Sequence, residues 1–146
     1  MTPEEQLQVV DAMAETLKDG SAEVRKEAFH CLVGLGLDGL ARIIDVVNES
    51  DSLERKIEAV QALGLAFGEG KVDKSGMIKT AIKSLEECLE KENDALAEAA
   101  INALGEIGTQ AIFSKPKLLA LLNRKKDNNR ICVKLGSALL KISPVN

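Results

Sequence analysis

Few side chains in this sequence could carry out chemistry. The 146 residues contain one histidine, His30, and three cysteines, Cys31, Cys88 and Cys132. A zinc site takes several closely placed histidine or cysteine ligands, and a hydrolytic triad needs its histidine between an acid and a nucleophile. Because the cysteines lie far apart in the sequence, we interpret them as reduced residues in or near the core of a cytoplasmic protein. We therefore expect no catalytic residue, no metal and no cofactor.

An acidic run is the second candidate, and it comprises Glu86, Glu87, Glu90 and Glu92. Paired carboxylates can act as general acid and general base. No histidine accompanies this run, and its spacing does not match a calcium-binding loop. Since lysines share the same face of the predicted helix, we interpret the run as a solvated helix surface.

The strongest charge asymmetry lies near the C-terminal end. Between residues 115 and 141 there are eight basic residues and one acid, whereas the whole chain carries a net charge of −4. Four basic residues are predicted to meet at one helix–helix turn: Arg124, Lys125, Lys126 and Arg130. Such a patch would attract a nucleic-acid backbone or an acidic membrane surface. The alternative is that this segment is simply the basic end of a soluble protein. The negative net charge of the whole chain and the scarcity of aromatic residues argue against nucleic acid as the ligand.

A repeated string predicts the elements that position these residues. Residues 59–64 read AVQALG and residues 100–105 read AINALG, with looser copies at 28–33 and 135–140. The repeated leucines are Leu32, Leu63, Leu104 and Leu139, at offsets of 31, 41 and 35 residues. Each copy has the apolar spacing of a helix, and a turn rich in Ser, Asp or Asn precedes it. A motif at this period is typical of stacked helices.

We therefore expect an all-α fold of about eight helices in a single domain, residues 1–146. The predicted helices span 4–18, 21–35, 38–49, 52–68, 76–91, 94–108, 116–125 and 128–142, with a turn at 109–114. The long break at 68–76 is interpreted as a tolerated loop, and a loop that contacts a partner is the alternative. His30, Gln61 and Asn102 share one motif position, which we expect to be half-exposed on the helix surface.

Residues 19–25 read DGSAEVR, and an Ala-rich helix and Gly-Leu-Gly follow. This pattern resembles a HEAT repeat, in particular the short HEAT-like type named after phycobilin lyases, over about residues 5–142. The resemblance implies a short right-handed α-solenoid of about four helix pairs. The later copies lack the Val24-Arg25 pair, so no continuous ladder of polar bonds between repeats is predicted. Some enzymes of this fold bind iron through His-Glu pairs, and others surround a damaged DNA base with aromatic side chains. The chain shows neither signature.

The resemblance also implies a partner surface, because the second helix of each pair lines a concave face in this family. We take those helices to be 38–49, 76–91 and 116–125. The residues predicted to bind a partner there are Arg42, Asp45, Lys79, Lys83, Glu86, Lys117 and Arg124. The favoured function is a non-catalytic protein-interaction scaffold. An anion-binding module is the alternative, and a lyase-like enzyme or enzyme subunit is a remote one.

The last predicted helix carries Ile131, Leu135, Leu139 and Ile142 on one face, and no helix follows to cover them. Because terminal repeats normally present a polar outer face, an uncovered stripe would bind a second copy or a partner. Burial against residues 116–125 is the alternative. No apolar run is long enough for a membrane span, and the first residues do not resemble a signal peptide.

Overall fold

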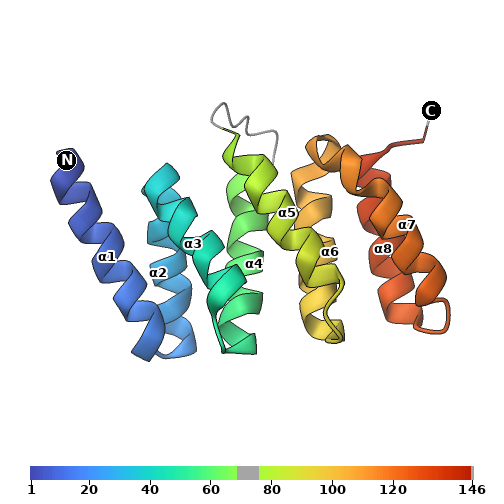
Figure 1. Ribbon diagram of the computed structural model, residues 1–146, viewed down its shortest axis with the longest axis horizontal. Coiled ribbons are helices and arrows are strands. Elements are labelled where there is room, and N and C mark those ends of the chain that lie inside the picture. Colours follow the sequence, from blue (N-terminus) through green and yellow to red (C-terminus); the bar gives the residue numbers. More distant parts are fainter. Residues whose placement is uncertain (69–75, 146) are drawn as a thin grey trace.

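The computed structural model describes residues 1–68 and 76–145, and within them the chain is helical (Figure 1). Its helices are α1 (Pro3–Asp19), α2 (Ala22–Gly34), α3 (Leu37–Glu49), α4 (Leu53–Phe67), α5 (Met77–Leu89), α6 (Asp94–Ile107), the 3₁₀ helix η1 (Gly108–Ser114), α7 (Lys115–Arg124) and α8 (Asn129–Ile142). The described residues contain no strand, so the predicted all-α fold is confirmed. The break predicted at 68–76 lies largely outside the described residues, and the turn predicted at 109–114 is the helix η1.

Short polar side chains begin the four helices that contain the repeated string, which we call the motif helices. In each, the capping side chain accepts a hydrogen bond from the backbone N–H three residues further on. The capping residues are Ser21 of α2, Ser52 of α4, Asn93 of α6 and Asn128 of α8. Each cap satisfies one of the N–H groups that a helix start leaves unpaired, so the local sequence fixes where these helices begin.

The helices form two layers. The motif helices α2, α4, α6 and α8 run side by side behind α1, α3, α5 and α7 in Figure 1. Each front helix packs extensively on the motif helix that follows it in the sequence, which gives the pairs α1/α2, α3/α4, α5/α6 and α7/α8. The pairs stack in chain order, so neighbours in space lie about 30 to 40 residues apart in the sequence.

An apolar core runs between the two layers through all four pairs. Leu32, Leu63 and Leu104, the leucines of the first three motif copies, are all completely buried. The fourth copy differs, because Leu139 is only partly buried and Leu135 takes the completely buried place. Since no helix pair could bury its apolar face alone, this shared core is what holds the stack together.

The motif layer is packed more tightly than the other layer. Helix α4 packs on α6, and α6 on α8, far more extensively than α3 packs on α5. The motif helices thus form the closer-packed of the two layers. That 38–49, 76–91 and 116–125 line a concave surface stays a prediction. Those segments form α3, α5 and α7, in the more widely spaced layer.

The apolar stripe of α8 is largely covered, so of the two alternatives the structure supports burial over a free stripe. Ile131, Leu135 and Ile142 are each at most 2% exposed. Helix α8 packs on α6 and η1 as well as on α7, so three elements share the covering of the stripe. The exposed apolar side chains of α8 are instead Val133 and Leu140, and assembly of two copies through this helix stays a prediction.

Candidate interaction groove

Close packing of the motif layer depends on a glycine in two of the motif copies. A Cβ atom on Gly64 would lie 3.0 Å from the Cα of Ala103, and one on Gly105 would lie 3.1 Å from the Cα of Ala138. Both separations are shorter than an ordinary van der Waals contact, so glycine is what lets the backbones approach this far. The two alanines occupy the same motif position in successive copies. One packing arrangement therefore repeats at the α4–α6 and α6–α8 interfaces.

The α2–α4 interface departs from this arrangement. Val33 stands where the later copies have glycine, and the alanine that corresponds to Ala103 is Ala62. A valine side chain prevents the close backbone approach, and α2 indeed packs on α4 less extensively than α4 packs on α6. Leu65 is 60% exposed at this interface. A pocket of about 480 Å³ opens between the two helices, and we call it the α2/α4 pocket.

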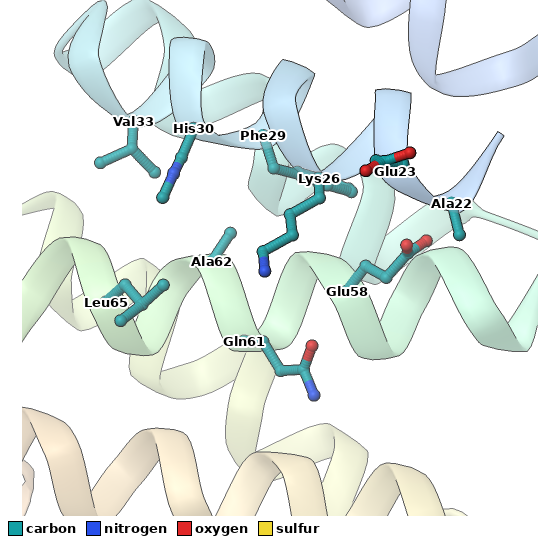
Figure 2. A pocket seen from close by; sticks show the side chains of 10 residues that line it. All are labelled: Ala22, Glu23, Lys26, Phe29, His30, Val33, Glu58, Gln61, Ala62 and Leu65. Atoms are coloured by element: carbon teal, nitrogen blue, oxygen red, sulfur yellow. The ribbon is translucent and has the colours of Figure 1, made fainter. Parts of the chain in front are cut away.

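Figure 2 shows the α2/α4 pocket with an apolar end and an acidic end. Lys26 and His30 reach from α2 toward α4, and Gln61 projects from α4. The apolar lining residues are Phe29, Val33, Ala62 and Leu65, and Glu23, Glu58 and Ala22 line the acidic end. A hollow of this size with an apolar floor and a few polar groups is suited to a bulky apolar group.

Arg25 ties α2 to α4 beside the acidic end. The residue is only 7% exposed, and its Nε donates a hydrogen bond to Glu58 Oε1 at 2.8 Å. The guanidinium also forms an ion pair with Glu54 at 3.0 Å and donates to the carbonyl oxygen of Gly20 at 2.8 Å. The hydrogen bond to Glu58 raises the pKa of Arg25 above its usual value. Glu58 is thus already neutralised, whereas Lys26 has no ion-pair partner among the described residues.

The pocket continues into two further hollows along the motif layer. The α4/α6 hollow, of about 640 Å³, shares Leu65 with the α2/α4 pocket. The α6/α8 hollow, of about 300 Å³, shares Gly105, Glu106 and Lys141 with the α4/α6 hollow. Each hollow shares lining residues with the next, so the three form a series over all four motif helices. We call this series the inner groove.

A row of polar side chains crosses the motif helices and meets the inner groove at the α2/α4 pocket and at the α6/α8 hollow. One exposed residue comes from each motif helix, always two positions before the repeated leucine: His30, Gln61, Asn102 and Ser137. The first two line the α2/α4 pocket, and the last two line the α6/α8 hollow. None of the four side chains has a hydrogen-bond partner within residues 1–68 and 76–145. We call these four residues the polar row. The sequence indicated the first three, whereas Ser137 was missed because it lies in the loosest motif copy.

The seven predicted partner-binding residues lie outside the inner groove. Arg42 and Asp45 line a separate pocket of about 390 Å³ between α1 and α3, where Arg42 pairs with Asp11 at 3.0 Å. Exposed side chains without an ion-pair partner in the described part of the chain are Asp45, Lys79, Lys83 and Arg124. Four of the seven therefore have no ion pair with a described residue, and all four lie on the more widely spaced layer.

Glu86 and Lys117 have a structural contact with each other. Glu86 Oε2 accepts a hydrogen bond from the buried hydroxyl of Ser114 at 2.7 Å, and its Oε1 lies 3.4 Å from Lys117 Nζ. Both bonds join α5 to the beginning of α7. The predicted role in partner binding is untested, but the side chain of Glu86 is only 16% exposed and already engaged.

The predicted anion patch is partly neutralised. Lys125 pairs with Asp94 at 3.1 Å, and Arg130 donates two hydrogen bonds of 2.9 Å to the carboxylate of Glu98. The Arg130 guanidinium holds the pKa of Glu98 below its usual value. The remaining cations, Arg124 and Lys126, are exposed. Sequence analysis missed both acids because they belong to α6, about 30 residues before the basic residues that they meet.

The cysteines do not share one environment. Cys88 is buried, and its burial raises the pKa of the thiol. Cys132 is partly buried and donates from Sγ to the carbonyl oxygen of Lys125. Cys31 is exposed, so its expected place in or near the core is wrong, because the outward face of α2 carries it. The described residues contain no group of three His, Cys, Asp or Glu side chains arranged to hold a metal ion.

None of the helices in the described ranges is both long and apolar enough to span a membrane. No protein-family model and no curated protein matches this chain. Among solved structures, the chain is similar to an engineered protein from the Northeast Structural Genomics Consortium, with a TM-score of 0.61 and 19% sequence identity. The match covers 91% of this chain, which spans 62% of the length of the engineered protein. At this identity the likeness concerns the fold alone.

Proposed function

We propose that this protein is a non-catalytic interaction module that binds a segment of a partner protein in the inner groove. The observation that carries the proposal is the series of three hollows with shared lining residues over all four motif helices. Stacked helix pairs offer long curved surfaces that suit an elongated partner. The α2/α4 pocket would supply an apolar anchor, and the polar row would supply hydrogen bonds along the rest of the groove.

The four similar helix pairs support, as part of this proposal, membership of the short HEAT-like repeat class. A scaffold role in the cytoplasm belongs to the same proposal. Anion binding through the C-terminal basic segment is the second candidate. Exposed Arg124 and Lys126 favour it, whereas the ion pairs of Lys125 and Arg130 reduce the free positive charge. The inner groove is therefore the better-supported surface.

Affinity capture from the cells that produce the protein would test the proposal, with nuclease treatment to remove nucleic acid. The groove variant is Leu65→Asp, which places a charge in the α2/α4 pocket at a side chain that is 60% exposed. The matched variant for the opposite layer is Lys79→Glu with Lys83→Glu, two exposed charges on α5. Circular dichroism would show that both variants keep the helical fold.

The proposal expects a protein that survives nuclease treatment, is lost with Leu65→Asp and is retained with the α5 variant. A protein lost only with the α5 variant would place the partner on the α3/α5/α7 layer and contradict the groove assignment. Recovery of nucleic acid alone would favour the anion-binding candidate. Binding to the C-terminal segment would also fall steeply with added salt.

A further inference from the structure

We propose that the segment bound in the inner groove is an extended peptide whose main chain hydrogen-bonds to the polar row. One bulky apolar side chain of this peptide fills the α2/α4 pocket. The inference rests on the proposed function and specifies the conformation and chemistry of the partner. Two observations carry it. Each motif helix contributes one residue to the polar row, and the large apolar lining residues gather at one end of the groove.

The distribution of apolar side chains argues against a helical partner. An amphipathic helix docks through several apolar anchors at successive turns, so its groove must be apolar over much of its length. In the inner groove, the large apolar side chains Phe29, Val33 and Leu65 gather at the α2/α4 end. The α6/α8 hollow is lined mainly by polar residues that include Asn102, Lys134 and Ser137, and among the described residues its one large apolar side chain is Val133. Glycines form much of the lining of the α4/α6 hollow, and its large apolar side chains are Leu65, which it shares with the α2/α4 pocket, and the buried Ile107. Most large apolar side chains of the groove thus gather around the α2/α4 pocket.

The chemistry of the polar row suits a peptide main chain. An extended segment presents both N–H donors and C=O acceptors, which must find partners when a groove covers them. Imidazole, carboxamide and hydroxyl groups each donate and accept, so every member of the row could bond to either kind of group. All four are exposed and have no hydrogen-bond partner in the described part of the chain. They can therefore bind a peptide without breaking a hydrogen bond to any residue in the described ranges.

The spacing of the row matches an extended chain. Packed helices lie about 8–10 Å apart, and an extended chain advances about 3.3 Å per residue. One step along the row therefore corresponds to about three peptide residues, and three steps from His30 to Ser137 correspond to about nine. A helix advances only about 1.5 Å per residue and keeps its main-chain groups to itself, so it could not use the row in this way.

The charges at the two ends of the inner groove predict the direction in which the peptide lies. The α6/α8 hollow is lined by Lys134 and Lys141 together with one acid, Glu106, and is net positive. The α2/α4 pocket has an acidic end, where Arg25 already neutralises Glu58. We therefore expect an acidic peptide residue near α8, about six to eight residues from the apolar residue in the pocket.

A display library of random twelve-residue peptides, selected on the full-length protein, supplies defined probes. The peptide with the strongest enrichment is then measured by isothermal titration calorimetry against the wild type and against Gln61→Ala with Asn102→Ala. The control is Asn48→Ala with Asn123→Ala, because these exposed amides lie on α3 and α7 in the opposite layer. A second series carries N-methyl groups at successive peptide bonds, which removes main-chain donors while the side chains stay unchanged.

The inference expects the Gln61/Asn102 variant to weaken binding by about tenfold or more, since each lost hydrogen bond contributes about 1 kcal/mol. N-methylation near the middle of the peptide has a similar effect, and the Asn48/Asn123 control has none. Peptide binding that is abolished by Leu65→Asp, but unchanged by Gln61→Ala with Asn102→Ala and by N-methylation, would overturn the extended main-chain inference. It would leave the groove proposal intact. No enriched peptide, or none affected by Leu65→Asp, would contradict both.

Discussion

The α2–α4 and α4–α6 interfaces are built from copies of the same motif, yet their surfaces differ. At the α4–α6 interface, Gly64 lies against the backbone of Ala103, and the helices pack closely. At the α2–α4 interface, Val33 takes the place of that glycine, the helices pack less extensively, and a pocket of about 480 Å³ lies between them along the length of α2. The α4/α6 hollow, of about 640 Å³, lies instead beyond the close contact, at the C-terminal ends of α4 and α6 beside η1. Both interfaces bury the repeated leucine completely.

The comparison separates two tasks of the motif. The buried leucine holds each pair in the stack, whereas the following residue sets how closely neighbouring motif helices approach. A change from glycine to valine at that following position keeps the helix and its core contact, and it adds a recess at the inner surface. Binding surfaces in such a stack can therefore arise from one side chain without any change of fold.

The largest expected effect comes from the buried leucine itself. Replacing Leu104 by alanine leaves a cavity in the tightly packed part of the stack and should lower the free energy of unfolding by about 3–4 kcal/mol. The same change at Leu32 should cost about 2–3 kcal/mol, because α2 has fewer constraints and can shift into the space. Urea denaturation measures both values. A loss at Leu32 that equals or exceeds the loss at Leu104 would contradict the difference in packing.

The next effect tests the close backbone approach. Gly105→Val would force α6 away from Ala138 and should destabilise the protein by about 2–3 kcal/mol. Gly136→Val is the matched control, since Gly136 lies in α8 and no neighbouring atom of the described residues lies within 4 Å of the added Cβ. The control should be neutral or slightly stabilising, because valine is a better helix former than glycine. Thermal unfolding of both variants provides the measurement, and equal shifts would refute the role of Gly105.

A smaller effect is expected when the α2–α4 interface is given the glycine of the α4–α6 interface. Val33→Gly restores the glycine of the later copies, so α2 should move toward Ala62 and the α2/α4 pocket should shrink. The loss of apolar contact and of helix propensity should together lower stability by about 1–2 kcal/mol. A crystal structure of the variant would show whether Leu65 becomes less exposed. A pocket of unchanged size would mean that Val33 does not hold the helices apart.

The smallest effect concerns the ion pair that joins the last two helix pairs. Arg130 lowers the pKa of Glu98 in the folded protein, so this contribution to stability is fully present above the unfolded pKa of about 4.3. The contribution is lost as the pH falls through the lower folded pKa. Arg130→Gln should therefore reduce the melting temperature slightly at neutral pH and leave it unchanged in strongly acidic solution. A difference that persists at low pH would point to lost packing of the arginine side chain.

The sequence predicted local structure well, because local chemistry determines it. Ser21 and Asn93 cap the helices that they were expected to begin, and the buried side of each motif helix follows the 3.6-residue period. The repeated leucines marked the core at Leu32, Leu63 and Leu104. The polar motif position of His30, Gln61 and Asn102 was also predicted to lie on the surface, and three quarters of the polar row could thus be found without a structure.

The tertiary structure decided what those elements present to a partner. The sequence could not show that α2, α4, α6 and α8 form the closer-packed layer. The contacts that decide this join residues far apart in the sequence, such as Gly64 and Ala103. The sequence also could not bring Asp94 and Glu98 to the basic segment or engage Glu86 with Ser114. Helix formation depends on neighbours within a few residues, whereas the inner groove depends on side-chain volumes that meet only after the helices stack.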